Sequence, residues 1–441
     1  MHIRLGARRL QSNLLPVIAE GTLEGQTVLL VLFSNYKLPI TNYKLRVFSH
    51  RTNWPLAPNR FSTALEKHRA SGRELLDLTA SNPTNLGLRY DAEAILASLA
   101  NPNALEYCPD AKGMRVARDA VSAYYRERGA HIDPERVVLT TSTSEGYSFV
   151  FRLLCDPGDE VLVPAPSYPL FEFLADIHDV RLRQYPLFYD HGWHLDVHAL
   201  TTAAGERTRA IMLVHPNNPT GSYVKPAEVE QLNAICAQRG LALVVDEVFL
   251  DFAHDGAAQS IFVHPITRSP DHPIPLTFTL SGLSKIAGLP QMKFAWIAVS
   301  GPEELARQAM ARLEVIADTY LSPNAPIQLA APVLFAQRHG FHRQLMARIR
   351  ANLAELDRRL ATQQACVRLQ IEAGWYAVLR VPVTRSDEDL VIELLEKKSV
   401  LVHPGHFYDF PAEGYLVLSL IAREEEFREG VKRVVKYVTA M

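Results

Sequence analysis

From about residue 60 onward, short apolar runs alternate with segments in which apolar residues recur at helical spacing. The apolar runs predicted to be strands are 136–142, 159–168, 209–221, 240–249, 277–285 and 294–299. The runs RAIMLVHPNNPTG (209–221) and GLALVVDEVF (240–249) begin with continuous apolar stretches, as strands buried on both faces do. Helical segments such as EGYSFVFRLL (145–154) separate the strands. This alternation predicts an α/β fold with a mostly parallel sheet covered by helices on both faces.

The pattern changes after residue 302, where a long helical stretch begins that is interrupted at LSPNAP (321–326). Mixed helices and strands follow, with strand candidates at 375–381 and 415–421. Because single cores stop growing near about 250–300 residues, a chain of 441 residues is expected to form two domains. The predicted parts are an N-terminal extension at 1–48, an arm belonging partly to the small domain at 49–89, a large domain at 90–320 and a small α+β domain at 321–441.

Residues 1–48 are predicted to be poorly structured. Their beginning carries Arg4, Arg8 and Arg9, a weak feature of transit peptides. The alternatives are an appended segment and a start codon placed too early. The apolar run TVLLVLF (27–33) is too short to span a bilayer.

Composition and charge narrow the class of protein. The chain is 48% hydrophobic and 21% charged, with a formal net charge of −2, so nothing in its charge favours nucleic acid or an anionic membrane as partner. The four cysteines lie far apart, without CxxC or zinc-ligand spacing: Cys108, Cys155, Cys236 and Cys366. Such cysteines are typical of a reduced, cytoplasmic protein without a metal site.

Polar side chains gather where the predicted strands end. These residues are Ser142, Thr143, Ser144, Tyr168, Asn217, Asn218, Asp246, Ser281 and Lys285. Each alone has an ordinary interpretation, such as a helix cap, a turn or a solvated charge. Because ligands of open parallel sheets bind at the carboxyl ends of the strands, we expect the set to face one crevice.

The set suits a flat, phosphorylated, nitrogen-containing aromatic ligand that bears an aldehyde. The helix that begins near Ser142 offers N–H groups and hydroxyls to a phosphate. Tyr168 can stack on the ring, and Asn218 can donate to a ring oxygen. Asp246 can keep a ring nitrogen protonated, and Lys285, placed among small residues in LSGLSKIAGLPQMK, can form a Schiff base.

Over residues 50–440 the chain resembles the class I aminotransferases of pyridoxal-phosphate (PLP) fold type I. The resemblance rests on motifs in the order and spacing of that family: EYCPDAKGMRVAR (106–118), the segment 141–172, HPNNPTG (215–221), VVDEVF (244–249) and SGLSKIAGLPQMK (281–293). It implies a large PLP-binding domain and a smaller domain. It also implies a homodimer with shared active sites.

The resemblance also implies roles for single residues. Lys285 is the Schiff-base lysine and proton shuttle, Asp246 pairs with the pyridine nitrogen, Asn218 with the phenolic oxygen, and Tyr168 lies over the ring. The phosphate is bound by Ser142, Thr143 and Ser144, together with Ser281 or Ser284 and with Lys293. Tyr107 reaches the phosphate of the cofactor in the neighbouring subunit.

The chain departs from the family pattern at three positions. Lys293 replaces an arginine, which keeps the charge but loses a two-pronged grip on phosphate. Phe249 replaces a tyrosine that donates to the phenolic oxygen, so we expect a more basic Schiff base. Val417 replaces the arginine that clamps the substrate carboxylate. Arg423 is a candidate substitute or a surface charge at a helix start, and Asn82 belongs to the loop that closes over substrate.

Together these features predict a PLP-dependent aminotransferase that acts on an L-amino acid and a 2-oxo acid by a ping-pong mechanism. One alternative is a PLP-dependent lyase on the same scaffold, which the missing arginine favours. The other is a PLP-binding protein without catalysis, against which the intact set of Lys285, Asp246 and Asn218 argues.

Overall fold

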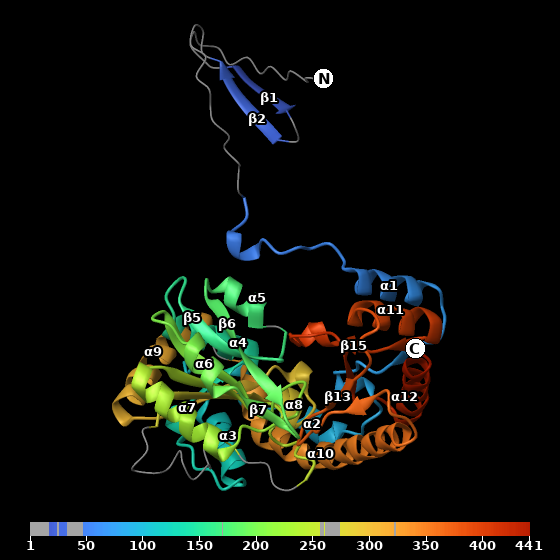
Figure 1. Ribbon diagram of the computed structural model, residues 1–441. Coiled ribbons are helices and arrows are strands. Elements are labelled where there is room, and N and C mark those ends of the chain that lie inside the picture. Colours follow the sequence, from blue (N-terminus) through green and yellow to red (C-terminus); the bar gives the residue numbers. More distant parts are fainter. Residues whose placement is uncertain are drawn as a thin grey trace. The chain divides into compact units, whose positions relative to one another are not determined.

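The computed structural model describes residues 17–23, 26–32, 47–169, 171–255, 260, 274–321 and 323–441. Contacts divide the chain into two units, Met1–Pro55 and Leu56–Met441. In the first unit, β1 (Val17–Leu23) and β2 (Gln26–Leu32) form an antiparallel hairpin (Figure 1). The stretch 1–48 was expected to be poorly structured, and most of its remaining residues lie outside the described ones.

The second unit is built on an eight-stranded sheet with the strand order β4-β11-β10-β9-β8-β5-β6-β7. The strands are β4 (Val137–Thr140), β5 (Glu160–Ala165), β6 (Arg181–Tyr189), β7 (Trp193–Leu195), β8 (Thr208–Val214), β9 (Ala242–Asp246), β10 (Thr277–Gly282) and β11 (Ala295–Ser300). β11 runs antiparallel to β4 and β10, β7 runs antiparallel to β6, and the other neighbours are parallel. The predicted mostly parallel sheet is confirmed.

Helices cover both faces of this sheet, as Figure 1 shows. One face packs against α4 (Thr143–Leu154), α5 (Phe171–Ile177) and α9 (Glu303–Tyr320). The other packs against α3 (Arg115–Arg126), α6 (Val197–Ala203) and α7 (Pro226–Arg239). The central strands β8 and β9 are therefore buried on both sides, which explains their continuous apolar sequence.

The C-terminal part contains a four-stranded antiparallel sheet ordered β12-β13-β16-β15. Its strands are β12 (Val367–Arg368), β13 (Tyr376–Arg380), β15 (His403–Pro404) and β16 (Tyr415–Ser419). A parallel pair joins β3 (Leu76–Asp77) to β14 (Val400–Leu401), and α1 (Arg60–Ala70) lies beside α11 (Asp387–Lys398). On these contacts we propose that the part of the predicted arm 49–89 that lies in the second unit belongs with the C-terminal part.

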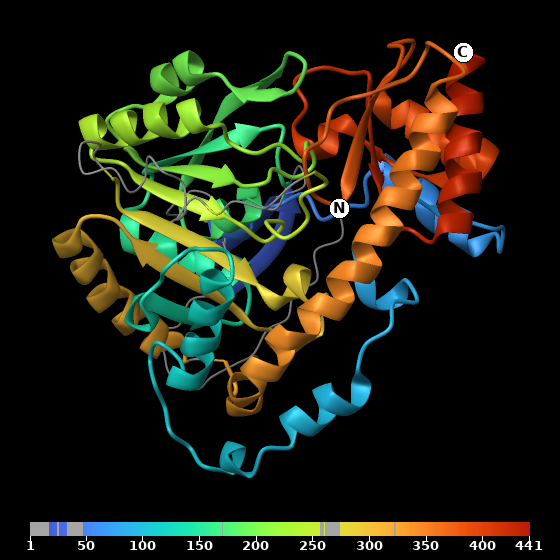
Figure 2. The same ribbon diagram turned by 90° about the horizontal axis from the view of Figure 1, so that it is seen from below.

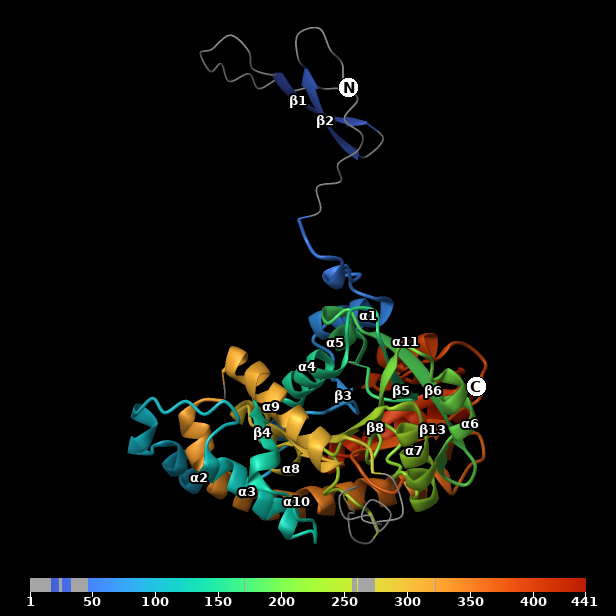
Figure 3. The same cartoon turned by 90° about the vertical axis from the view of Figure 1, so that its left-hand side faces the viewer.

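A single long helix, α10 (Ala325–Leu360), connects the region of the large sheet with the C-terminal part (Figure 2). It packs against α2 (Ala92–Leu99) and α3 near its beginning, where the three helices lie side by side (Figure 3). It also packs against α12 (Glu424–Thr439). No helix in the described part of the chain is long and apolar enough to cross a membrane.

Candidate active site

Lys285 lies on α8 (Leu283–Ile286), the single helical turn that directly follows β10. Its Nζ is 4.9 Å from the centroid of the Trp375 ring and 5.7 Å from that of Phe249. Burial lowers the pKa of Lys285 to about 8, and the carboxylate of Asp246 opposes this shift. The amine is therefore uncharged over a wider pH range than that of a solvated lysine.

The glycines around Lys285 are required by the protein's own packing. A Cβ at Gly282 would lie 2.9 Å from the side chain of Ala295 on the neighbouring strand. Gly288 has a φ of +64°, and a Cβ there would lie 2.2 Å from the Phe341 ring on α10. These glycines let α8 sit tightly between β11 and α10, which fixes the position of the lysine.

Asp246 ends β9 and is buried. Its Oδ2 accepts a hydrogen bond of 2.7 Å from the Tyr147 hydroxyl of α4, and its Oδ1 accepts one of 3.0 Å from the backbone N–H of Val248. Burial raises the pKa of Asp246, while both hydrogen bonds and the charge of Lys285 lower it. A buried carboxylate of this kind is stabilised by a cationic partner.

The two asparagines of the segment that follows β8 differ in their bonding. The Nδ2 of Asn217 donates to the carbonyl of Pro166 at 3.0 Å and to Oγ1 of Thr220 at 2.9 Å, which makes it part of the loop structure. Asn218 is buried too, but its Oδ1 has no hydrogen-bond partner among the described residues. An unpaired buried polar atom costs about 1–3 kcal/mol. Asn218 is therefore the asparagine that is free to bind a ligand.

The N-terminus of α4 follows β4 at the same edge of the sheet. The Oγ of Ser142 caps it by accepting from the N–H of Glu145 at 3.1 Å, and Thr143 and Ser144 begin the helix. All three predicted phosphate residues are half-buried. The Glu145 carboxylate accepts from the N–H of Thr141 at 2.6 Å, so it stabilises the same helix end.

The serines before and on α8 differ in accessibility. Ser281 is fully buried in β10, and its hydroxyl donates to the backbone carbonyl of Glu247 at 3.4 Å. Ser284 is half-buried on α8. The geometry therefore favours Ser284 over Ser281 as the serine that is available to a ligand.

Two aromatic rings complete the region around Asp246. Tyr168 is 39% exposed, and its pKa is raised first by burial and then by the charge of Asp246, which lies near it. Phe249 is buried, with ring centroids 5.2 Å from Trp375 and 6.3 Å from Tyr376. The Tyr168 ring is thus accessible to a ligand, whereas the Phe249 ring is buried against Trp375 and Tyr376.

The other predicted residues lie apart from this group. Lys293 is exposed, with a left-handed backbone at φ 52°, and Tyr107 is 80% exposed. Asn82 is exposed and accepts from the Thr84 N–H at 3.1 Å. Their predicted contacts with cofactor or substrate stay predictions.

Val417 and Arg423 have opposite environments. Val417 is 1% exposed on β16, where it faces Val378 on β13 and His403 on β15. Arg423 is exposed at the start of α12, and its Nη2 donates to the carbonyl of Asn85 at 3.4 Å. Arg423 thus lies at the loop that carries Asn82, and its role in binding a carboxylate stays a prediction.

Two residues of the site were not singled out from the sequence. Tyr147 occupies an apolar helical face, so its pattern signals packing; only the fold reveals that its hydroxyl bonds to Asp246. Trp375 begins the run WYAVLRV, whose pattern predicts only a strand. The sequence feature that could have indicated Trp375 is the pair of aromatic residues, Trp375 and Tyr376, directly after Gly374.

The strand-end residues lie at the carboxyl edge of the large sheet, which is where open parallel sheets bind their ligands. The sequence model of the aminotransferase class I and II family matches residues 73–434, and the chain belongs to this family. This confirms the predicted family and enzyme class.

Curated relatives and solved structures agree with this assignment. The chain is 26% identical to the glutamate-pyruvate aminotransferase AlaA of Haemophilus influenzae over 83% of this chain and 91% of that protein. It is 27% identical to the alanine aminotransferase of Mycobacterium tuberculosis over 84% of this chain and 87% of that one. The alanine aminotransferase structure from Pyrococcus furiosus has a TM-score of 0.79 at 21% identity, covering 89% of this chain and all of that chain (100%). The last similarity confirms the fold.

Proposed function

We propose that this aminotransferase uses pyridoxal 5′-phosphate, bound at the strand-end site, to move an amino group between an L-amino acid and a 2-oxo acid. One observation carries the proposal. The Lys285 amine, which has a lowered pKa, follows β10, and the buried carboxylate of Asp246 ends the neighbouring strand β9. The same part of the fold holds Asn218, whose amide oxygen has no hydrogen-bond partner among the described residues. Buried charged and unpaired polar groups of this kind lower the stability of the folded protein unless a ligand binds to them.

The residues present fit this cofactor. Asp246 would hold the pyridine nitrogen in its protonated form, and the charge gained there would stabilise the buried carboxylate. The Nδ2 of Asn218 would donate a hydrogen bond to the phenolic oxygen, because the amide oxygen can only accept. The N-terminus of α4 would receive the phosphate, since its first N–H groups lack intrahelical partners. When bound, the cofactor supplies an electron sink for the bond being broken at the substrate.

Lys285 performs the proton transfer in the proposed reaction. Its Nζ would accept the proton from the substrate Cα and hold it until it is given up again, so the amine has to exchange between charged and uncharged forms near neutral pH. Its lowered pKa of about 8 supports this role. The reverse sequence on a second oxo acid gives ping-pong kinetics.

The relatives are named glutamate-pyruvate aminotransferase and alanine aminotransferase. These names favour alanine and glutamate as the first amino donors to test, and pyruvate as the first acceptor for glutamate. Incubation of the chain with PLP, glutamate and pyruvate is expected to form alanine and 2-oxoglutarate in equal amounts. Amino transfer that requires the oxo acid supports the proposal. Release of ammonia and an oxo acid from an amino acid without any acceptor would instead support the lyase, which the buried, apolar Val417 favours.

We also propose a cytoplasmic homodimer whose subunits share their active sites. Tyr107 supports the shared site, because an 80% exposed tyrosine has most of its surface available to a second subunit. The described cysteines Cys108, Cys155, Cys236 and Cys366 are free, which supports a reducing compartment.

Phe249→Tyr tests the predicted basicity of the lysine-bound cofactor. The new hydroxyl is expected to donate to the phenolic oxygen and to stabilise its anion, which lowers the pKa of the absorbance transition. Phe252→Tyr is the matched control, because Phe252 is an equally buried ring whose centroid lies 6.4 Å from that of Phe249. Spectrophotometric titration of the three proteins measures the effect; equal pKa values for wild type and Phe249→Tyr would contradict it.

A further inference from the structure

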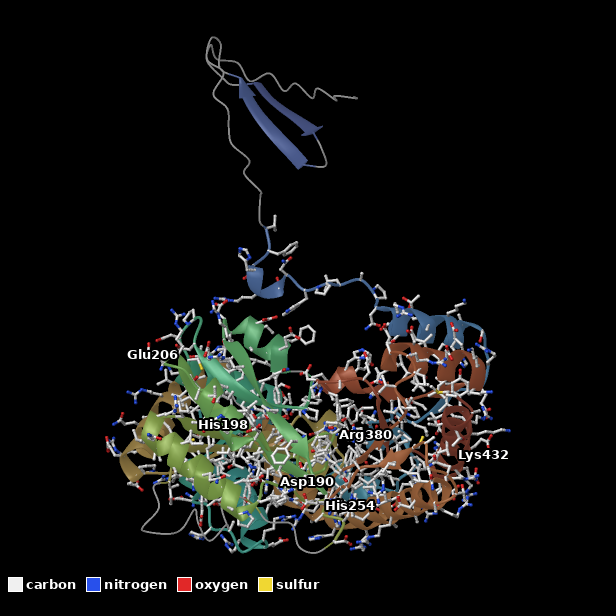
Figure 4. The ribbon with its side chains drawn as sticks, viewed as in Figure 1. Asp190, His198, Glu206, His254, Arg380 and Lys432 are labelled. Atoms are coloured by element: carbon white, nitrogen blue, oxygen red, sulfur yellow. The ribbon has the colours of Figure 1, made fainter. Side chains whose placement is uncertain are left out.

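Trp375 is held in place by the loops that carry the candidate cofactor residues. It lies between Gly374 and the start of β13, and its carbonyl accepts from the N–H of Leu420 at 2.7 Å. The N–H of Gly374 donates to the carbonyl of Phe252 at 2.8 Å, in the loop after β9. The ring of His254, labelled in Figure 4, lies 3.0 Å from the Gly374 carbonyl. The backbone before Trp375 is thus bonded to the loop that follows β9, the strand that ends in Asp246.

A second loop also bonds to the segment before Trp375. The N–H of Ala373 donates to the carbonyl of Gly221 at 2.9 Å, three residues after Asn218. Gly221 has a φ of +68°, and a Cβ there would lie 2.2 Å from the Ala373 carbonyl. This close approach requires glycine at position 221. Trp375 therefore has a defined position relative to both Asn218 and Asp246.

The side chain of Trp375 is fully buried and faces Lys285. The Lys285 Nζ lies 4.9 Å from its ring centroid and 5.7 Å from that of Phe249. The two rings meet edge to face at an interplanar angle of 80°. Both distances lie within the range of about 6 Å over which an aromatic face attracts a cation.

Opposing forces act on this amine. Burial removes water from Lys285 and disfavours its charged form. Among the described residues, Asp246 is the charged group that favours the ammonium, and it acts from β9. Aromatic faces also attract the ammonium, and they do so without burying a second charged group. Tryptophan gives the strongest attraction of this kind.

We propose that Trp375 is a positioning residue for Lys285, whose indole face holds the ammonium form of the amine and allows it to carry a proton in an otherwise apolar site. This inference rests on the proposed role of Lys285 and extends it. Phe249 forms the second wall of the same aromatic site. A lysine that shuttles a proton needs both charge states, and Trp375 stabilises the charged one.

The indole ring offers a clean substitution. Its Nε1 has no hydrogen-bond partner in the described part of the chain, so replacing the ring breaks no hydrogen bond. Trp375→Phe keeps an aromatic face, whereas Trp375→Leu keeps an apolar filling without one. Trp193→Phe is the matched control: Trp193 is buried, its Nε1 is likewise unpaired, and it lies on β7 at the opposite edge of the sheet from β4.

The experiment measures how readily the Lys285 amine reacts with an amine-selective acylating reagent as a function of pH. The full chain is used, freed of cofactor by treatment with hydroxylamine and dialysis, and modification of the peptide that contains Lys285 is quantified by mass spectrometry. Wild type is expected to titrate near pH 8. Trp375→Leu is expected to titrate about one pH unit lower, Trp375→Phe in between, and Trp193→Phe as wild type.

Equal titration of wild type, Trp375→Phe and Trp375→Leu would overturn the inference. So would a larger change in Trp193→Phe than in Trp375→Leu. If Trp375→Leu does not fold by circular dichroism, Trp375→Met provides the same apolar filling with a more flexible chain. Because the unloaded protein is measured, the outcome is independent of amino transfer: failure to bind PLP overturns the proposed function, and unchanged titration overturns the role of Trp375.

Discussion

Lys285→Ala is expected to lower the rate of amino transfer at least about 1,000-fold. The variant lacks the amine that we propose as both the bond to the cofactor and the base for the Cα proton, and loss of a group with such a double role has large effects on rate. The rate constant for amino transfer at saturating PLP and substrate is the measurement. The variant should still bind PLP, because the other candidate contacts at Asp246, Asn218 and the start of α4 remain.

Lys293→Ala is the matched control for the loss of a lysine. Lys293 is exposed and eight residues further along the chain, and its predicted contact is with the phosphate. Its removal is expected to weaken the affinity for PLP but to leave the rate at saturating PLP within about threefold of wild type. A Lys285→Ala protein with more than a tenth of the wild-type rate would contradict the assignment of Lys285.

Asp246→Asn is expected to lower the rate about 100- to 1,000-fold. Asparagine has nearly the same shape, but its neutral amide does not stabilise a positive charge on the ring nitrogen. Removal of one such electrostatic contact in a buried site costs about 2.7–4 kcal/mol of transition-state stabilisation. Steady-state rates at saturating PLP give this effect, and equilibrium binding separates it from weaker cofactor affinity.

Tyr147→Phe shows whether the charge of Asp246 or its orientation is responsible. This variant removes the 2.7 Å hydrogen bond to Oδ2 and leaves the carboxylate and the bond from the Val248 N–H in place. We expect a loss of about tenfold or less, together with reduced stability from the lost bond to a charged group. If Asp246→Asn retained a third of the wild-type rate, the carboxylate would have no electrostatic role.

The sequence predicted the central strands because their burial on both faces leaves continuous apolar runs. It did not predict β6 (Arg181–Tyr189), since most of its residues are exposed and Tyr185 and Leu187 are its buried positions. The sequence also indicated where Asp246 and Asn218 lie: Asp246 ends β9 and Asn218 follows β8, and parallel strands place their carboxyl ends together.

The remaining features of the site depend on contacts between distant parts of the chain. Trp375 reaches Lys285 across 90 positions of sequence, and the loops that hold it come from three other segments. Tyr147 similarly reaches Asp246 from a helix whose pattern indicates only packing. Periodicity reports which face of an element is buried, but it carries no information on which buried polar groups meet.

The absorption spectrum of the full chain with PLP, recorded before and after addition of single amino acids, tests the central claim most directly. With wild type, the absorption of the lysine-bound cofactor is expected to convert into that of the amine form at shorter wavelength when alanine or glutamate is added, and pyruvate or 2-oxoglutarate is expected to reverse it. The same additions should leave Lys285→Ala without catalytic conversion. A cofactor band that never converts with any amino acid, or no band with added PLP, would contradict the proposed amino transfer through Lys285.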